Sequence, residues 1–277
     1  MIPFDFEYYQ PDSIEEALDV FQKSTESGEK ALFISGGTEF ITFARINQLQ
    51  ADAIIDVKGI PECHSLLKDG ERIRIGAAVS LNLITDSCIF PLMGEKVRRI
   101  ADRTSRNKIT IGGNVNSQLI YREGVLPLLL ADAKVSIAGH EQKIASIESV
   151  FEQKFRLEPG QFLVDFQLDA SFTECPFFSL KKTKQSRVGY PIVSLAALVK
   201  DGSLRVALSG VCEYPFRSKE LEAVLNDLTL SAGERVVKAS TLLPAPIIDD
   251  LQASKDYRHF LLKQCLEETI EALELVI

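Results

Sequence analysis

The segment Phe33–Phe40, with the sequence FISGGTEF, places two adjacent glycines directly after a short apolar run that begins at Ala31. The run Ala31–Ser35 is typical of a buried strand, and glycines let the backbone take positive φ angles and approach a ligand closely. Consecutive amides in such a turn form a nest that binds phosphate oxygens, and the Thr38 hydroxyl could add a donor. Alternatively, the segment is an ordinary tight turn between a strand and a helix.

A second glycine pair occurs in Thr110–Asn114, with the sequence TIGGN. Alone it could also be a turn, with glycines at positive φ angles. Two such segments in one chain favour a dinucleotide ligand, because two amide-rich loops can enclose a pyrophosphate from both sides. Neither segment matches G-x-G-x-x-G or a P-loop, so we expect neither the Rossmann nor the Walker mode of binding.

Composition narrows the class of protein. The chain has 277 residues, of which 45% are hydrophobic and 25% charged, with a formal net charge of -8. No basic block suggests a nucleic-acid partner, and no apolar run approaches the roughly 18 residues of a membrane span. The start, Met1–Gln10, contains Asp5 and Glu7 and lacks the basic region of a signal peptide. We therefore expect a cytoplasmic protein.

The five cysteines and three histidines are scattered along the chain. Iron–sulfur and zinc sites need several thiolates or imidazoles close together, so we expect no metal site. No Ser/His/Asp arrangement is evident, and we assign no catalytic residue. Any redox chemistry must then come from a bound organic cofactor.

Strand and helix patterns predict an α+β fold. Ser13 and Glu16 form a capping box before a first helix, as do Ser231 and Glu234 near the end, and a long helix follows Ser254. Strands are expected at residues 31–35, 54–57, 73–75, 134–138, 162–168, 177–182, 192–199 and 204–208. They do not alternate regularly with helices, which disfavours a doubly wound sheet.

Three local expectations are more specific. Residues 162–168 alternate apolar and polar side chains, which predicts an edge-exposed strand. A helix is expected from about Gly94 to Asp102, and Asp201-Gly202 is expected to form a hairpin turn. Residues 169–176 are a plausible junction between domains.

Several motifs in the first two thirds of the chain resemble one family. Ser35–Glu39 resembles the first flavin loop of the FAD-binding domain of molybdopterin dehydrogenases, and Ser105–Asn114 resembles its second loop, usually RNVGTIGGN. Between them, Asp56–Val57 and Ile60–Glu62 resemble the stretch LIDI…IPEL, and Arg72–Ala77 resembles the strand LRIGA. The motifs occur in the family's order.

The last third resembles the carbon monoxide dehydrogenase flavoprotein C-terminal domain. Gly210–Pro215 with Arg217 is similar to its GGVAPxPxR motif, and Ser254 with Tyr257–Arg258 is similar to its SAEYR motif. The resemblance implies a vanillyl-alcohol-oxidase (PCMH)-type FAD-binding domain over residues 1–168, in subdomains of about 1–56 and 57–168. A smaller α+β domain over 169–277 would follow it.

The resemblance also implies a function. The chain would be the FAD-binding electron-transfer subunit of a xanthine-dehydrogenase-like molybdenum hydroxylase. Electrons would come from a molybdopterin-binding subunit through [2Fe–2S] clusters on a partner, and would pass to an acceptor such as NAD. Purine (xanthine or hypoxanthine) oxidation is the expected reaction of the assembly; carbon monoxide, nicotinate or an aromatic aldehyde are alternative substrates.

The resemblance implies which residues of this chain would bind FAD, because each matches a position in the family's motifs. Leu163 would contact the flavin ring through its backbone, Glu123 would hydrogen-bond FAD, and Lys181 would stabilise the negative charge of the reduced ring. The predicted FAD-binding residues are Phe33, Ile34, Ser35, Gly36, Gly37, Thr38, Glu39, Phe40, Ile100, Thr110, Ile111, Gly112, Gly113, Asn114, Glu123, Leu163 and Lys181.

Some positions leave alternatives open. Ser117–Glu123 departs from the family's ADPxSD stretch, and Glu39-Phe40 replaces the commoner Asp-Leu. Tyr190 could shield the flavin ring or simply pack at the surface, and Tyr121 has the same alternatives. Arg106 could pair with a phosphate or be a solvated loop residue. At the level of function, a flavin-free scaffold subunit and a stand-alone flavin oxidoreductase remain alternatives.

Overall fold

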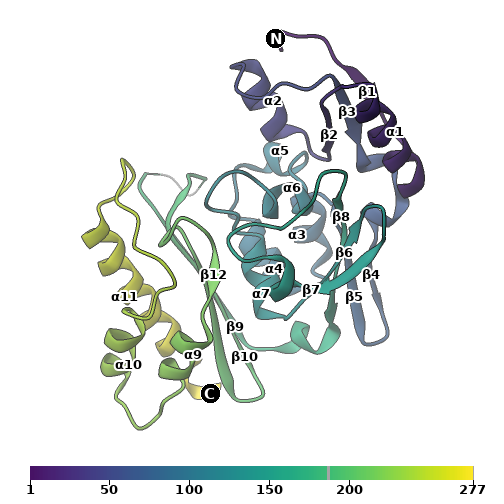
Figure 1. The fold of residues 1–277 in the computed structure, drawn as a ribbon. Helices are drawn as coiled ribbons and strands as arrows, with labels where there is room; N and C mark the ends of the chain where they lie inside the picture. The colour runs from purple at the N-terminus through teal and green to yellow at the C-terminus, as the bar shows by residue number, and fades with distance from the viewer. Residues whose placement is uncertain (186–187, 277) are drawn as a thin grey trace.

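Three β-sheets follow one another along the chain in the computed structural model, which describes residues 1–185 and 188–276. We call them the N-terminal, middle and C-terminal sheets; their strands lie within residues 7–56, 66–169 and 177–217. In Figure 1 the N-terminal sheet lies at the top, the middle sheet below it, and the C-terminal sheet at the lower left. The expected α+β fold is confirmed.

The N-terminal sheet is parallel. β1 (Glu7–Tyr9), β3 (Ala53–Asp56) and β2 (Ala31–Ile34) lie side by side in that order, connected by α1 (Ile14–Glu26) and α2 (Thr38–Arg45). Ser13 caps α1, since its Oγ accepts a hydrogen bond from the Glu16 amide at 3.1 Å. The Glu16 carboxylate accepts from the Asp12 amide at 3.0 Å, so the returning bond of the predicted capping box reaches one residue further back.

The middle sheet is antiparallel, with the order β4 (Leu66–Asp69), β5 (Arg72–Gly76), β8 (Phe162–Asp169), β6 (Lys134–Ala138) and β7 (Lys143–Ser146). Between β3 and β4 lie two 3₁₀ turns, Val57–Gly59 and Pro61–His64. The helices of this part are α3 (Leu81–Ser87), α4 (Pro91–Val97), α5 (Arg103–Arg106), α6 (Ile111–Val115), α7 (Val125–Leu130) and α8 (Ile147–Val150).

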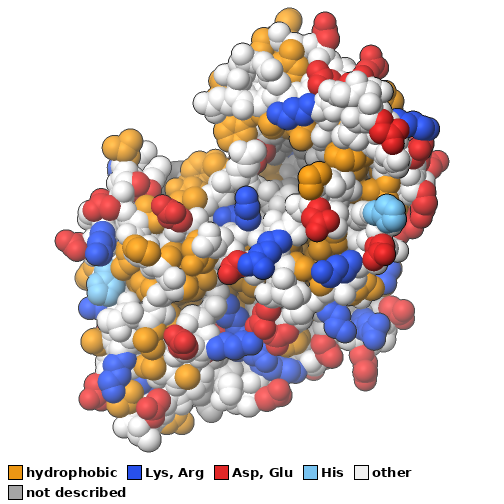
Figure 2. Space-filling view, in the orientation of Figure 1, with side chains coloured by type: hydrophobic (Ala, Val, Ile, Leu, Met, Phe, Trp, Pro, Cys, Tyr) orange, Lys and Arg blue, Asp and Glu red, His pale blue; other side chains and the backbone are white. Residues whose placement is uncertain are grey.

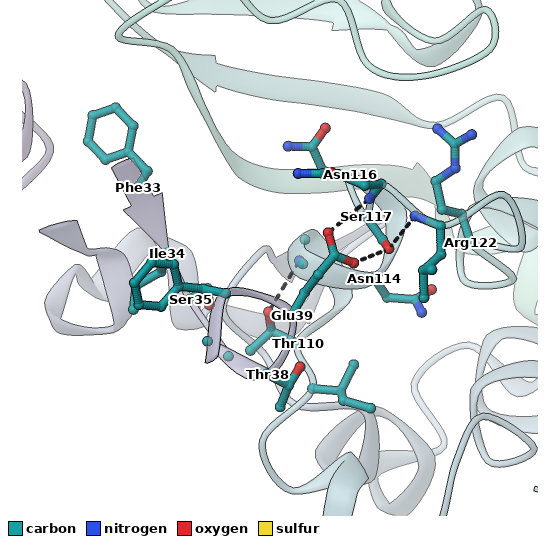
Figure 3. A pocket seen from close by; sticks show the side chains of 18 of the residues that line it. Phe33, Ile34, Ser35, Thr38, Glu39, Thr110, Asn114, Asn116, Ser117 and Arg122 are labelled. Carbon is teal, nitrogen blue, oxygen red and sulfur yellow. Dashed lines mark hydrogen bonds between the residues drawn. The ribbon is translucent and has the colours of Figure 1, made fainter. Parts of the chain in front are cut away.

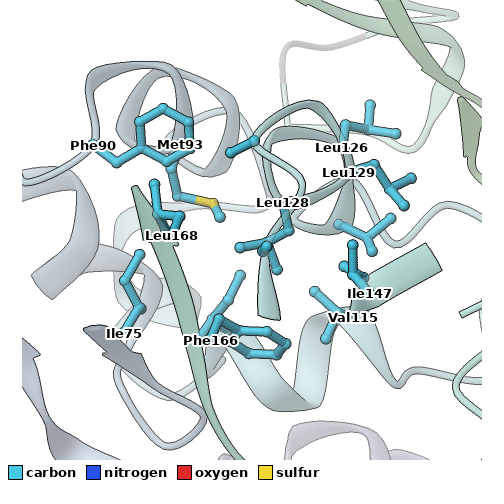
Figure 4. Close-up of a cluster of buried hydrophobic side chains, with 14 of the residues drawn as sticks. Ile75, Phe90, Met93, Val115, Leu126, Leu128, Leu129, Ile147, Phe166 and Leu168 are labelled. Atoms are coloured by element: carbon cyan, nitrogen blue, oxygen red, sulfur yellow. The ribbon is translucent and has the colours of Figure 1, made fainter. Parts of the chain in front are cut away.

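These helices and the sheet share the largest apolar core. Phe166 and Leu168 from β8 lie in one buried cluster with Met93 of α4 and Leu128 of α7 (Figure 4). The run Val125–Leu130 forms the helix α7 before β6, and all of its residues are apolar and buried, as expected of a helix that is apolar on every face.

The prediction of an edge strand at residues 162–168 is wrong. β8 is the central strand of the middle sheet and is almost wholly buried. Its Asp165 is buried with partners: Asp165 Oδ1 accepts from Ser136 Oγ at 2.7 Å and from Nε2 of the half-buried Gln167 at 3.0 Å. Alternation of polar and apolar residues marks an edge only when the polar side chains face water, and here they bond to each other.

The helix expected from Gly94 to Asp102 is displaced. α4 begins at Pro91, a residue suited to the first helical position, and ends at Val97. Asp102 begins the next helix instead, because its Oδ1 accepts from the Ser105 amide at 2.8 Å and caps α5.

The C-terminal sheet is also antiparallel, in the order β12 (Phe216–Arg217), β11 (Ser203–Ser209), β10 (Pro191–Lys200) and β9 (Phe177–Thr183). A 3₁₀ turn, Ala170–Glu174, leads into β9. Asp201 and Gly202, at φ angles of +54° and +73°, form the expected hairpin turn between β10 and β11. The helices α9 (Lys219–Leu225), α10 (Ala232–Ala239) and α11 (Lys255–Leu273) follow, and a 3₁₀ turn Glu274–Val276 ends the described chain.

The predicted caps of the last helices are confirmed. Ser231 and Glu234 form a full capping box at α10, and Ser254 caps α11. Two arginines of the C-terminal sheet then satisfy carbonyls at the end of α7: Arg217 Nη1 donates to Leu129 O at 3.0 Å and Arg205 Nη1 to Leu130 O at 2.8 Å. The C-terminal sheet is therefore joined to the middle part by hydrogen bonds.

No helix in the described part of the chain is both long and apolar enough to cross a membrane. Within residues 1–185 and 188–276, no three His, Cys, Asp or Glu side chains are grouped so that they could hold a metal ion.

Candidate functional site

A cavity of about 1420 Å³ lies where the three sheets meet. Its walls come from Ala31–Phe40 after β2, from the segments around α5 and α6, and from Lys181 and Tyr190 beside the C-terminal sheet. Figure 2 shows the molecule hollowed between the N-terminal part at the top and the rest. An elongated ligand in this cavity would contact all three parts of the fold.

Of the seventeen predicted site residues, sixteen line this cavity. Residues far apart in sequence, such as Phe33, Gly113, Leu163 and Lys181, are thus brought to one place. The exception is Ile111, which is fully buried in the core of the middle part. It begins α6 and points away from the cavity, so it supports the wall from behind.

The first glycine segment is both a turn and a wall of the cavity. It links β2 to α2, and Gly37 has a φ of +68°, which a residue with a side chain rarely adopts. A Cβ on Gly36 would lie 2.1 Å from the carbonyl oxygen of Lys108, so only glycine lets this segment approach the second one. Among the described residues, no side chain caps α2, which leaves its N-terminal amides available to an anion.

The second glycine segment is the start of a short helix rather than a loop. Thr110 caps α6, and its Oγ1 accepts from the Gly113 amide at 3.2 Å. The expected positive φ is wrong for this pair, because both glycines are helical. Gly112 is required because a Cβ there would lie 2.8 Å from Ala77 O, whereas a Cβ on Gly113 would meet only Thr110 Oγ1, at 3.1 Å. Gly113 therefore leaves open space on the cavity side.

Glu39 joins the two walls (Figure 3). Its carboxylate accepts a hydrogen bond from the Ser117 hydroxyl and another from the Gln118 amide, the latter at 2.9 Å. Arg122 lies nearby; burial lowers the pKa of its guanidinium, and Glu39 opposes this effect. The sequence assigns no role to Ser117 and Gln118, which belong to the stretch that departs from the family pattern. No local signal shows that Glu39, seventy-eight residues away from Ser117, would bind them.

Two polar groups in the cavity wall have no partner within the described part of the chain. They are Ser35 Oγ and Arg122 Nε, and both are buried. Buried polar atoms are normally hydrogen-bonded, so unpaired ones that line a cavity indicate a polar or anionic ligand. Together with the space in front of Gly113, they fit a phosphate-containing cofactor such as FAD.

The other end of the cavity carries charges. Lys181 Nζ donates to Glu123 Oε2 and to Arg99 O, both at 2.8 Å. Glu123 Oε1 accepts from Ser194 Oγ at 2.6 Å. Both oxygens of Glu123 thus have protein partners. Lys96, which sequence reasoning missed, donates to Ser194 Oγ from behind the wall at 3.0 Å.

Tyr121 and Tyr190 lie at the cavity, whereas Arg106 does not line it. Tyr121 and Tyr190 stack on each other at the cavity, with ring centroids 4.8 Å apart and planes inclined by 14°. Arg106 fits neither of its expected roles, because its guanidinium donates to Ile100 O, to Ala101 O and to Asn82. It holds the turn before α5 in place.

An aromatic group at the N-terminal side of the cavity was also missed. Phe21 of α1 stacks on Phe33 of β2 with centroids 5.0 Å apart, and Phe33 lies 4.7 Å from Phe162 of β8. All three line the cavity. In the sequence they look like ordinary core residues of three separate elements.

Comparison with known proteins identifies the family. The profile described as "FAD binding domain in molybdopterin dehydrogenase" matches residues 4–168. The carbon monoxide dehydrogenase medium chain of Hydrogenophaga pseudoflava is 24% identical over 286 residues, with 98% of each chain covered. The nicotine 6-hydroxylase medium subunit of Paenarthrobacter nicotinovorans is 26% identical over 274 residues, with 95% of each covered.

A solved structure shows the same fold. In the carbon monoxide dehydrogenase of Hydrogenophaga pseudoflava, the matching chain aligns with a TM-score of 0.87 at 22% identity, over 100% of this chain and 99% of that one. The FAD-type fold expected from the sequence motifs is thereby confirmed. The chain belongs to the family of FAD-binding domains of molybdopterin dehydrogenases, and it is the FAD-binding flavoprotein subunit of an oxidoreductase of the molybdenum hydroxylase type.

Proposed function

We propose that the chain holds one non-covalent FAD in the cavity and passes electrons from [2Fe–2S] clusters on a partner subunit to an acceptor such as NAD. FAD supplies the electron chemistry, because it accepts electrons and gives them up again. The observation that best supports this proposal is that two glycine segments meet at one cavity, with the unpaired Ser35 hydroxyl in its wall.

In this proposal the glycine segments hold the pyrophosphate. The uncapped N-terminus of α2 and the open face of Gly113 provide backbone donors and space on opposite sides of the cavity. Thr38 and Asn114 line the same region and can donate hydrogen bonds to the cofactor. Neither histidine nor cysteine occurs in either segment, which supports non-covalent binding.

The flavin ring is proposed to occupy the end of the cavity near the C-terminal sheet. Ile100 and Leu163 offer apolar contacts there, and Lys181 offers a cation. Lys181 has three N–H donors, and the described residues provide acceptors for two of them. The third donor is then available to the ring, while the stacked Tyr121 and Tyr190 border this end.

The remaining parts of the proposal concern domains and partners. We also propose domain boundaries near residues 56 and 168, and the breaks between the three sheets support them. The proposed partners are a molybdopterin-binding subunit and a [2Fe–2S] subunit, and the proposed compartment is the cytoplasm. Purine oxidation by the assembly rests on sequence motifs alone. The relatives named above carry names for carbon monoxide and nicotine, so each of these substrates belongs in the assay.

The test is a reconstitution in which each subunit is omitted in turn. The complete set should transfer electrons from substrate to acceptor, and the chain alone should hydroxylate nothing. The FAD-loaded chain alone should still pass electrons from NADH to a dye. Substrate hydroxylation by the chain alone would overturn the proposal.

Two alternatives give different outcomes. A flavin-free scaffold would be colourless, and its complex would work with a chain whose cavity is blocked. A stand-alone flavin oxidoreductase would turn over a small substrate without partners. Acid precipitation separates the modes of binding, since non-covalent FAD enters the supernatant while covalent flavin stays in the pellet.

A further inference from the structure

A fully buried lysine lies behind the charged end of the cavity. Lys96 of α4 is 0% exposed, and its Nζ donates to Leu180 O at 2.9 Å, Ser194 Oγ at 3.0 Å and Leu195 O at 2.6 Å. An ammonium has three N–H donors, so these acceptors use all of them. A buried charge costs free energy unless it is partnered, and lysine is seldom fully buried for packing alone.

A chain of hydrogen bonds leads from Lys96 to the cavity wall. Ser194 Oγ accepts from Lys96 and donates to Glu123 Oε1 at 2.6 Å. Lys181 Nζ donates to the other carboxylate oxygen, Glu123 Oε2, at 2.8 Å. Glu123 and Lys181 line the cavity, whereas Lys96 and Ser194 lie behind them. The Glu123 carboxylate is thus held from both sides.

We propose that Lys96 is a positioning residue that, through Ser194, holds and compensates the Glu123 carboxylate and so leaves the Lys181 ammonium available to the flavin ring. This inference rests on the proposed function, because it takes the ring to lie at this end of the cavity. Two lysines and one carboxylate make the group net positive when Lys96 is protonated. A net positive group stabilises the negative charge that reduction places on the ring.

The competing view is that Lys96 only fastens α4 to the C-terminal sheet, since its carbonyl acceptors belong to β9 and β10. A purely structural role predicts lower stability for Lys96→Met, with unchanged electrostatics at Glu123. The positioning role predicts a change at Glu123 itself, and the same change when Ser194 is removed.

The experiment has two readouts. The first needs no flavin: the carboxylate stretching bands of Glu123 are followed by infrared spectroscopy of the apo chain, with Glu123→Gln to assign the bands. Lys96→Met and Ser194→Ala should both shift these bands, because the carboxylate loses either the Ser194 donor or the cation that holds this donor in place. The second is the midpoint potential of the FAD-loaded chain, or of the complex that contains it, measured at pH 6, where Lys96, whose pKa is lowered to about 7, carries its proton. Both variants should lower the potential, and Lys96→Met should lower it less in a Glu123→Gln background.

Lys182→Met is the matched control. Lys182 is next to Lys181 on β9, but it pairs with Glu268 of α11 at 2.7 Å and does not line the cavity. It should change neither readout. Unchanged carboxylate bands and an unchanged potential in both Lys96→Met and Ser194→Ala would overturn the inference. If Lys96→Met does not fold, Ser194→Ala decides. If neither chain nor complex binds FAD, the proposed function fails, and the infrared readout still decides the role of Lys96.

Discussion

At the scale of single residues, the four glycines of the two segments have different tasks. Gly36 and Gly112 permit close packing, because a Cβ on either would collide with a carbonyl oxygen, of Lys108 or of Ala77. Gly37 permits a left-handed backbone. A Cβ on Gly113 would meet a single neighbour, Thr110 Oγ1 at 3.1 Å, so a substitution there disturbs the packing less than at Gly36 or Gly112 and is the better test of ligand binding.

Gly113→Val should therefore reduce FAD occupancy strongly, with affinity lowered about tenfold or more, the equivalent of about 1.4 kcal/mol. The reason is that the added side chain fills the space proposed for the pyrophosphate, while its Cβ meets only Thr110 Oγ1 in the folded chain. Flavin absorbance per chain after gel filtration measures the effect. Gly233→Val in α10 is the control, since nothing lies within 4 Å of its Cβ position. Full occupancy in Gly113→Val would refute the assignment of this segment.

Lys96 gives a prediction for pH. The pKa of Lys96 is lowered from 10.5 to about 7, chiefly by burial. Arg99 and Lys181 also lower this pKa, whereas Glu123 and Cys265 raise it. Between pH 7 and about 10, the unfolded chain binds this proton and the folded chain has lost it, so stability from this group rises with pH. The slope is at most about 1.4 kcal/mol per pH unit. The free energy of unfolding is measured in urea from pH 7 to 10 for the wild type and for Lys96→Met. The wild-type value minus the Lys96→Met value should rise with pH. A difference that is flat with pH would contradict it.

At the scale of secondary structure elements, sequence patterns worked where local chemistry decides the outcome. Ser231 with Glu234 and Asp201 with Gly202 were predicted because caps and hairpin turns depend on a few adjacent residues. The pattern failed for β8, where the polar residues bond to Ser136 on a neighbouring strand. A single sequence does not show which distant side chain satisfies a polar group.

The polar group within the middle sheet can be tested directly. Asp165→Ala should lower the free energy of unfolding by about 1–3 kcal/mol, because it leaves the Ser136 hydroxyl without its buried acceptor and removes one of the two acceptors of Gln167 Nε2. Chemical denaturation with unchanged m-value is the measurement. Asp69→Ala, at the exposed end of β4, should change stability by less than about 0.5 kcal/mol. Equal effects of the two substitutions would show that the buried group contributes little.

At the scale of the whole molecule, family motifs predicted which residues line the cavity but not the hydrogen bonds that fix them in place. Sixteen of the seventeen residues expected to bind FAD line one cavity, because motif order fixes the fold and the fold brings the segments together. Lys96 and the bridge from Glu39 to Ser117 were not predicted, since both depend on contacts between residues far apart in sequence. These contacts connect the middle part to its two neighbours.

The cavity is built from all three parts of the fold, so its ligand should stabilise all three together. FAD at 100 times its dissociation constant should add about 2.7 kcal/mol to the free energy of unfolding. Hydrogen exchange should then slow both in Ala31–Phe40, beside the N-terminal sheet, and in β9 around Lys181. Gly113→Val at the same FAD concentration should show neither change. Protection confined to the N-terminal and middle parts would mean that the cofactor does not reach Lys181, and would place the flavin ring elsewhere in the cavity.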